Sequence, residues 1–233
     1  MVRCTSLSVF LEQVKVVRTT DSGDSLIERL FGTVGVDNVV LVGIANGIDL
    51  TYPPGGRKVW PDDEQDWALR EGGARPPTRL RLATVEPFGS GCEVKLNLLV
   101  RFYERDWDNM QALLDAAVKK AVSVGMLSVP PAYSGFSAGI EADAIKVIKD
   151  VLDFFTGFQS EFMGDIPIVL PAHRLDDGAQ LSSFPWGAEL SRDKFQEEEQ
   201  DSFKYKTMIE NWGGKWEVIL YFERVCTRPP EDE

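Results

Sequence analysis

The sequence predicts a mixed α+β fold that is mainly an antiparallel β-sandwich with an inserted amphipathic helical hairpin. Three observations support this prediction. Apolar and polar residues alternate in several segments up to about residue 104, which is the period of half-buried strands. The apolar period then changes to about 3.6 residues between 107 and 158, as in helices that bury one face. Alternation resumes between 164 and 226.

The chain is expected to form one β-sandwich domain over residues 1–226. Its strands would fall at about 5–104 and 164–226, with the helical hairpin inserted at about 107–158. Neither group of strands offers enough elements to close a sandwich alone, so both should share one core. Residues 227–233 contain two prolines and three acids and are expected to form a disordered acidic tail.

The first strand segment contains a change of phase. Apolar residues alternate up to Leu11, and alternation continues from Val14 in the opposite phase. A β-bulge at Glu12 and Gln13 would keep both halves facing the core, because one extra residue restores the register. We therefore expect Leu11 and Val14 to be buried.

The next segments are shorter and are separated by turn residues. Strands are expected at 27–36, 39–45 and 79–84, and the Gly- and Pro-rich stretch 46–77 is expected to be irregular. The segment 94–102 has the clearest alternation in the chain. Its second face carries charged and polar residues, which predicts one buried and one mostly wet face.

Two helices are expected from the apolar stripes in 110–122 and 140–155, with a Pro-Pro break between them. A short strand at 166–170 follows, and the chain then passes through an irregular stretch. The last two alternating runs flank Gly213 and Gly214, which predicts a β-hairpin.

Composition limits the classes of function. The net charge of −12 disfavours binding to nucleic acids and anionic membranes. A structural zinc site is not expected, because the three cysteines are widely separated and the chain has a single histidine. One disulfide with one free thiol stays open as an alternative. No signal peptide or transmembrane run is recognisable, so a cytoplasmic location is the default expectation, with non-classical release left open.

Acidic loops predict a cation site. If the first strands form an up-and-down meander, three acidic loops meet at one pole of the sandwich, and calcium prefers oxygen ligands of this kind. The alternative is that turns and helix caps simply use these residues. The candidate ligands are Asp21, Asp24, Asp62, Asp63, Asp66, Asp106 and Asp108.

Tryptophans in or beside the same loops predict a binding surface. Trp60, Trp67 and Trp107 could contact a partner protein or a glycan, because exposed aromatic residues often mark interaction sites. The alternative is that they anchor their own loops to the core.

No segment matches a catalytic or nucleotide-binding motif. His173 lies near Asp176 and Asp177, but a third catalytic partner cannot be named from the sequence. The favoured function is therefore a non-catalytic binding or assembly module that acts through the acidic and aromatic pole. Two alternatives stay open, namely a membrane-active, toxin-like protein that uses the helical hairpin and a hydrolase with a carboxylate-based site.

Overall fold

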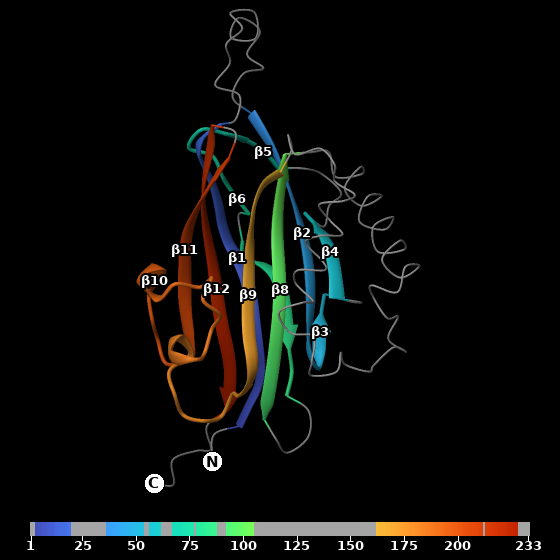
Figure 1. Cartoon of the computed structure of the whole chain (residues 1–233), viewed down its shortest axis with the longest axis vertical. Helices are drawn as coiled ribbons and strands as arrows, with labels where there is room; N and C mark the ends of the chain where they lie inside the picture. Colours follow the sequence, from blue (N-terminus) through green and yellow to red (C-terminus); the bar gives the residue numbers. More distant parts are fainter. Residues whose placement is uncertain are drawn as a thin grey trace, which may run out of the picture.

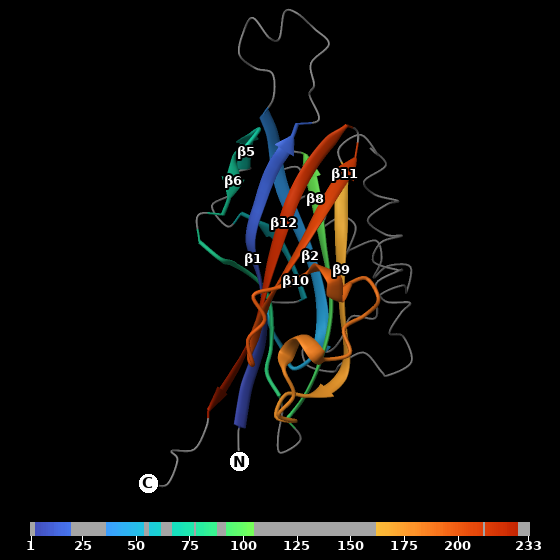
Figure 2. The ribbon, with the colours of Figure 1, turned by 90° about the vertical axis from the view of Figure 1, so that its left-hand side faces the viewer.

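The computed structural model describes residues 3–19, 36–53, 56–61, 67–76, 78–87, 92–104, 162–211 and 213–227. These residues form two antiparallel β-sheets that pack face to face (Figures 1 and 2). The helices that lie wholly within the described ranges are two short 3₁₀ turns, η4 (Leu181–Ser183) and η5 (Arg192–Lys194). None of the helices described there is long and apolar enough to cross a membrane.

The larger sheet has the strand order β10-β11-β12-β1-β7-β3, and β6 pairs with β1 beside this path. We call it sheet A. Its longest ladder joins β1 to β12, so the first and last strands of the described chain are neighbours. The strand bounds are β1 (Arg3–Arg18), β3 (Leu50–Tyr52), β6 (Ala74–Arg75), β7 (Leu80–Val85), β10 (Phe195–Gln196), β11 (Ser202–Asn211) and β12 (Gly214–Thr227).

The smaller sheet, sheet B, has the order β4-β2-β8-β9, and β5 pairs with β2. Strands β8 and β9 are adjacent and antiparallel although 57 residues, 105–161, separate them in sequence. The strand bounds are β2 (Val36–Ile48), β4 (Arg57–Trp60), β5 (Trp67–Arg70), β8 (Glu93–Glu104) and β9 (Phe162–Arg174).

The mixed α+β class predicted from the sequence is wrong, because the described residues form an all-β sandwich-like fold without an α-helix. The helical hairpin expected at 107–158 lies outside the described residues, and the described residues contain no helical pair that would support an α+β class. Periodicity is a local signal, whereas the class is set here by strand pairing between distant segments such as β8 and β9.

The predicted β-bulge is confirmed. The pairing of β1 with β12 shifts register between Leu11 and Gln13, where the sequence changes phase. Leu11 and Val14 are both 0% exposed, so the bulge keeps the apolar residues of both halves in the core. The side chain of Glu12 is thereby placed on the opposite, outer face of sheet A.

Most other long strands also agree with the sequence. The segments 39–45, 79–84, 94–102 and 166–170 lie in β2, β7, β8 and β9, and β11 and β12 form the predicted hairpin with Gly213 at φ +83°. Most of 27–36 lies outside the described residues. The stretch 46–77 was expected to be irregular but contains β3 to β6, short strands that pair with longer ones.

The prediction that one face of β8 is mostly exposed to solvent is also wrong. Apolar residues from Val94 to Phe102 face the core as expected, but Asn97 and Arg101 on the other face are only 4% and 2% exposed. Arg101 is tolerated there because its guanidinium lies 3.1 Å from the Asp165 carboxylate on β9. A charged residue in an alternating pattern therefore did not indicate solvent here.

One apolar core lies between the two sheets and draws on strands from both parts of the chain. It includes Leu7 and Leu41 from the first part and Ile168 and Phe222 from the second. A buried polar contact crosses the core, where the Trp216 indole donates a hydrogen bond of 2.7 Å to Asp37 on β2. The hydrogen bond satisfies a carboxylate that is 0% exposed.

Gly43 on β2 is required by the packing of Trp60. A Cβ at Gly43 would overlap the six-membered ring of the Trp60 indole, which is 0% exposed and enclosed. We expect Gly43→Ala to lower the free energy of unfolding by about 1–3 kcal/mol in urea denaturation, as overpacking does. Trp60→Leu should cost less in the Gly43→Ala background than in the wild type, and equal costs in both backgrounds would contradict the overlap.

Candidate functional site

The residues predicted to form the acidic pole lie outside the described part of the chain. This holds for all seven aspartates, Asp21, Asp24, Asp62, Asp63, Asp66, Asp106 and Asp108, and for Trp107. Calcium binding at that pole therefore stays a prediction. The described residues contain no group of three or more side chains suited to hold a metal ion.

The two predicted binding tryptophans that are described belong to strands rather than to loop surfaces. Trp60 ends β4 and is 0% exposed, and its indole N–H donates to the Tyr52 hydroxyl at 3.4 Å. Trp67 begins β5 and is 9% exposed. Both rings pack in the core, which agrees with the alternative that they anchor the surrounding chain.

The single histidine sits in a cluster of titratable groups near the end of β9. His173 Nε2 lies 2.9 Å from Asp177 Oδ2, and Arg174 donates hydrogen bonds of 3.0 and 3.1 Å to Asp176. Partial burial and the neighbouring Asp176 carboxylate raise the pKa of the Cys92 thiol. A thiol with a raised pKa is protonated near neutral pH, so Cys92 is not activated as a nucleophile.

Arg224 ties the segment after β9 to sheet A. Its guanidinium is almost fully buried and donates to the carbonyl oxygens of Leu175, Ala179 and Gln200 at 2.7, 2.9 and 3.2 Å. It also contacts Asp201 Oδ1 at 2.7 and 2.9 Å. These bonds give Arg224 a structural role, because they use its donors within the chain.

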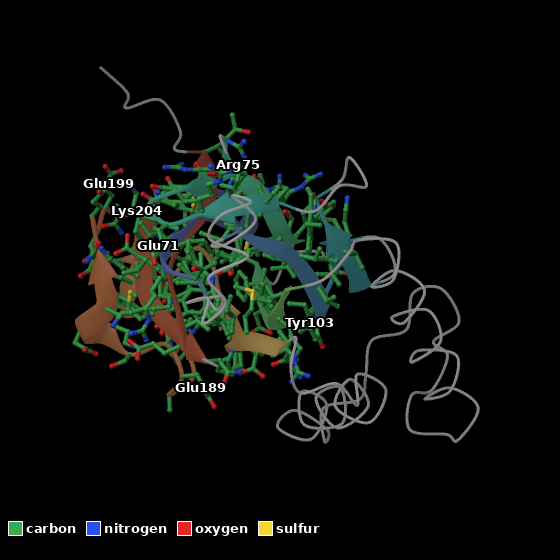
Figure 3. The ribbon with its side chains drawn as sticks, turned by 90° about the horizontal axis from the view of Figure 1, so that it is seen from above. Glu71, Arg75, Tyr103, Glu189, Glu199 and Lys204 are labelled. Atoms are coloured by element: carbon green, nitrogen blue, oxygen red, sulfur yellow. A yellow bond between two sulfur atoms is a disulfide. The ribbon has the colours of Figure 1, made fainter. Side chains whose placement is uncertain are left out.

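On the outer face of sheet A, cationic side chains lie beside aromatic rings. Most side chains here alternate with the core residues of β1, β7, β11 and β12 and therefore point away from sheet B. Tyr52 differs, because it lies on β3, where its hydroxyl accepts from Trp60 of sheet B. Figure 3 shows Lys204 of this face on the opposite side of the molecule from Tyr103 of sheet B. We define the cationic–aromatic face as Phe10, Glu12, Tyr52, Arg79, Arg81, Lys204 and Tyr221.

Strand order brings these residues together. Phe10 on β1 is the register partner of Tyr221 on one side and of Arg81 on the other. Lys204 on β11 is the register partner of Tyr221, so four strands contribute to one row. Register partners lie roughly 5 Å apart, which makes the row about 15 Å long.

Arg79 and Lys204 are held at Tyr221 by Glu12. The Arg79 guanidinium carbon lies 3.4 Å from the centre of the Tyr221 ring, and Arg79 Nε donates to Glu12 Oε2 at 3.1 Å. The other Glu12 oxygen lies 2.7 Å from Lys204 Nζ, which also contacts Glu197 at 2.6 Å. These two carboxylates raise the pKa of Lys204, so the ammonium stays charged over the physiological range.

A second stacked arginine lies on the neighbouring tyrosine. The Arg81 guanidinium carbon is 4.1 Å from the centre of the Tyr52 ring, and Lys58 Nζ is 5.2 Å from the same centre. Arg81 is exposed and has no acidic partner among the described residues. Its N–H donors are therefore available to an acceptor that arrives from solvent.

Only part of this site could be predicted from the sequence. Arg79 and Arg81 are visible as two basic residues in one alternating segment, but their tyrosine partners are 142 and 29 residues away. The sequence around Glu12 predicts the bulge, but it does not show that the Glu12 carboxylate contacts both Arg79 and Lys204. No protein-family model matches the chain, and the comparison with curated proteins gives no match.

Proposed function

We propose that the protein is a non-catalytic binding or assembly module that recognises an anionic partner through the cationic–aromatic face. The observation that carries the proposal is the pair of arginines stacked on Tyr221 and Tyr52 on one side of sheet A. The partner would present carboxylate, sulfate or phosphate groups to the two guanidinium groups.

Stacking prepares an arginine to bind an anion. A guanidinium that lies against an aromatic ring keeps its N–H edge directed sideways and loses little freedom on binding. Arg79 is fixed further by Glu12, whereas Arg81 lacks an acidic partner in the described part of the chain. The expected order is that Arg81 meets the anion directly while Arg79 and Lys204 contribute local positive potential.

The charge of the whole chain narrows the choice of partner. A net charge of −12 repels a densely charged polyanion such as duplex nucleic acid. Glu12 and Glu197 lie among the cations of the face and add to this repulsion. A partner with separated anionic groups, such as an acidic protein segment or an acidic glycan, fits this pattern better.

The disulfide bears on the compartment in which the partner is met. Cys4 and Cys226 are register partners on β1 and β12 and are bonded to each other, while Cys92 is free. Disulfides persist in oxidising surroundings, so the bond favours a compartment outside the cytoplasm over the default location predicted from the sequence.

Charge reversal at the face tests the proposal. We expect the wild type to bind a fluorescent glutamate-rich peptide or a short dextran sulfate in an anisotropy titration at low salt. Arg79→Glu combined with Arg81→Glu should weaken that binding by about tenfold or more, because the direct contact of Arg81 and the positive potential from Arg79 both become repulsive. Binding should also weaken as salt is added.

The matched control carries the same change of net charge elsewhere. Arg3 and Arg70 are exposed on β1 and β5 and do not belong to the face. Arg3→Glu combined with Arg70→Glu should change binding by less than about threefold through long-range charge alone. The proposal fails if wild type binds neither probe, or if the control pair weakens binding as much as the reversal of Arg79 and Arg81.

A further inference from the structure

One edge of sheet A is only partly covered. Strand β11 pairs with β12 from Ser202 to Asn211, but on its other side β10 pairs only with Lys204 and Tyr205. The edge from Lys206 to Glu210 has no neighbouring strand within the described residues, as the upper part of β11 in Figure 1 shows. Open edges of this kind are ready templates for another strand.

The hairpin register identifies the backbone groups that point along this edge. Asn211 pairs with Gly214 across a two-residue turn, and hydrogen-bonded and non-bonded pairs then alternate along β11 and β12. Lys206, Met208 and Glu210 therefore direct their N–H and C=O groups away from β12. The bonds described for the chain supply no backbone partner on that side.

We propose that the edge of β11 pairs with the same edge of a second copy of this chain. In an antiparallel arrangement centred on Met208, each Lys206 faces Glu210 of the second copy and the two Met208 side chains face each other. Opposite charges and apolar side chains are favourable cross-strand pairs. The contact is isologous, so it closes as a dimer and does not continue into a filament.

The side chains of β11 favour a second copy over an unrelated strand. The order Lys206, Met208, Glu210 complements itself when reversed, and Met208 is 38% exposed, which is unusual for a large apolar side chain in this structure. The pairing is confined to Lys206–Glu210, and Asn211 of the second copy must diverge from Tyr205, because β10 already pairs with Tyr205. A shift of the register by two residues in one direction would place Glu210 opposite Lys204, whose edge β10 also occupies. A shift in the other direction would place Glu210 opposite Met208 and leave it without an opposite charge. The charges and β10 thus select the same alignment.

The pairing has a geometric consequence for the outer surface. Antiparallel strands joined at an edge are related by a twofold axis perpendicular to the sheet, so sheet A continues from one copy into the other with the same face outward. Both cationic–aromatic faces would then lie on one side of the dimer. The dimer itself does not depend on what that face binds.

A charge-exchange series on the full chain tests the dimer by sedimentation velocity from low to high micromolar concentration. The wild type should show a concentration-dependent dimer. Lys206→Glu or Glu210→Lys alone should weaken dimerisation by about tenfold or more, because the twofold axis repeats each unfavourable pair. Lys206→Glu combined with Glu210→Lys should restore the dissociation constant to within about threefold of the wild type, since opposite charges again face each other.

The double exchange separates dimerisation from chain stability. Within one chain Lys206 contacts Glu217 at 2.6 Å and Glu210 contacts Lys215, so the double exchange brings like charges together at both places. An effect through folding alone would make the double exchange the weakest dimer. Lys215→Glu is the control, because it breaks the contact with Glu210 on β12 and leaves the edge unchanged.

Each outcome decides the proposal. A dimer that is lost in the single exchanges, restored in the double exchange and kept in Lys215→Glu supports edge pairing at β11. A wild type that stays monomeric over the whole concentration range overturns it. Failure of the double exchange to restore the dimer, or loss of the dimer in Lys215→Glu, overturns it as well.

Discussion

Val14→Asp is expected to lower the free energy of unfolding by about 4 kcal/mol or more, measured by urea denaturation. Val14 is 0% exposed on β1, which lies inside sheet A between β12 and β6. A carboxylate at this position would be buried among apolar side chains. It would have to unfold the strand locally or take up a proton at a high cost.

A neighbouring position provides the control for this prediction. Val17 lies on the same strand and is 44% exposed. Val17→Asp should change the free energy of unfolding by less than about 1 kcal/mol, because its charge stays in water. Similar losses at the two positions would show that the bulge does not direct Val14 into the core.

Arg224→Leu is expected to lower the free energy of unfolding by about 3–5 kcal/mol, again by urea denaturation. Leucine keeps part of the apolar contact but removes the guanidinium donors to Leu175, Ala179, Gln200 and Asp201. The buried Leu175 carbonyl oxygen would lose its guanidinium donor, and the Ala179 and Gln200 carbonyl oxygens would each lose one of their donors. The Asp201 carboxylate would lose its contact with the Arg224 cation. Amide hydrogen exchange should accelerate between residues 175 and 201 before it accelerates in β1 or β12.

Arg174 is the matched control for Arg224. Its side chain is 59% exposed, and it donates hydrogen bonds to the neighbouring Asp176. Arg174→Leu should cost less than Arg224→Leu, because the Arg174 guanidinium lies mostly in water, although its partner Asp176 is only 7% exposed. If Arg224→Leu cost no more than Arg174→Leu, the hydrogen bonds of Arg224 would be dispensable for docking the segment.

The long strands could be predicted because their signal is local. A strand with one side in the core has apolar residues at every second position. The bulge at Glu12 appears as a change of phase within a single segment. The short strands between 46 and 77 carry no such pattern. They exist because β1, β2 and β7 offer edges to pair with, and those partners are distant in sequence.

The candidate site was harder to predict for a related reason. Its central row is assembled from β11, β12, β1 and β7, and the order of strands in sheet A is not encoded in any one segment. Tyr221 and Arg79 each look like an ordinary outward residue of an alternating run. Only the sheet order makes them neighbours at 3.4 Å.

The cross-link between Cys4 and Cys226 has a mechanical consequence. Arg3 pairs with Thr227 and Cys4 pairs with Cys226, so the covalent bond lies one pair inside the open end of the β1–β12 ladder. A pulling force applied at the start of β1 and the end of β12 would otherwise peel these strands apart pair by pair. The disulfide arrests that peeling after the first pair and carries the load itself, so the sandwich would transmit tension without extending for as long as the bond stays oxidised.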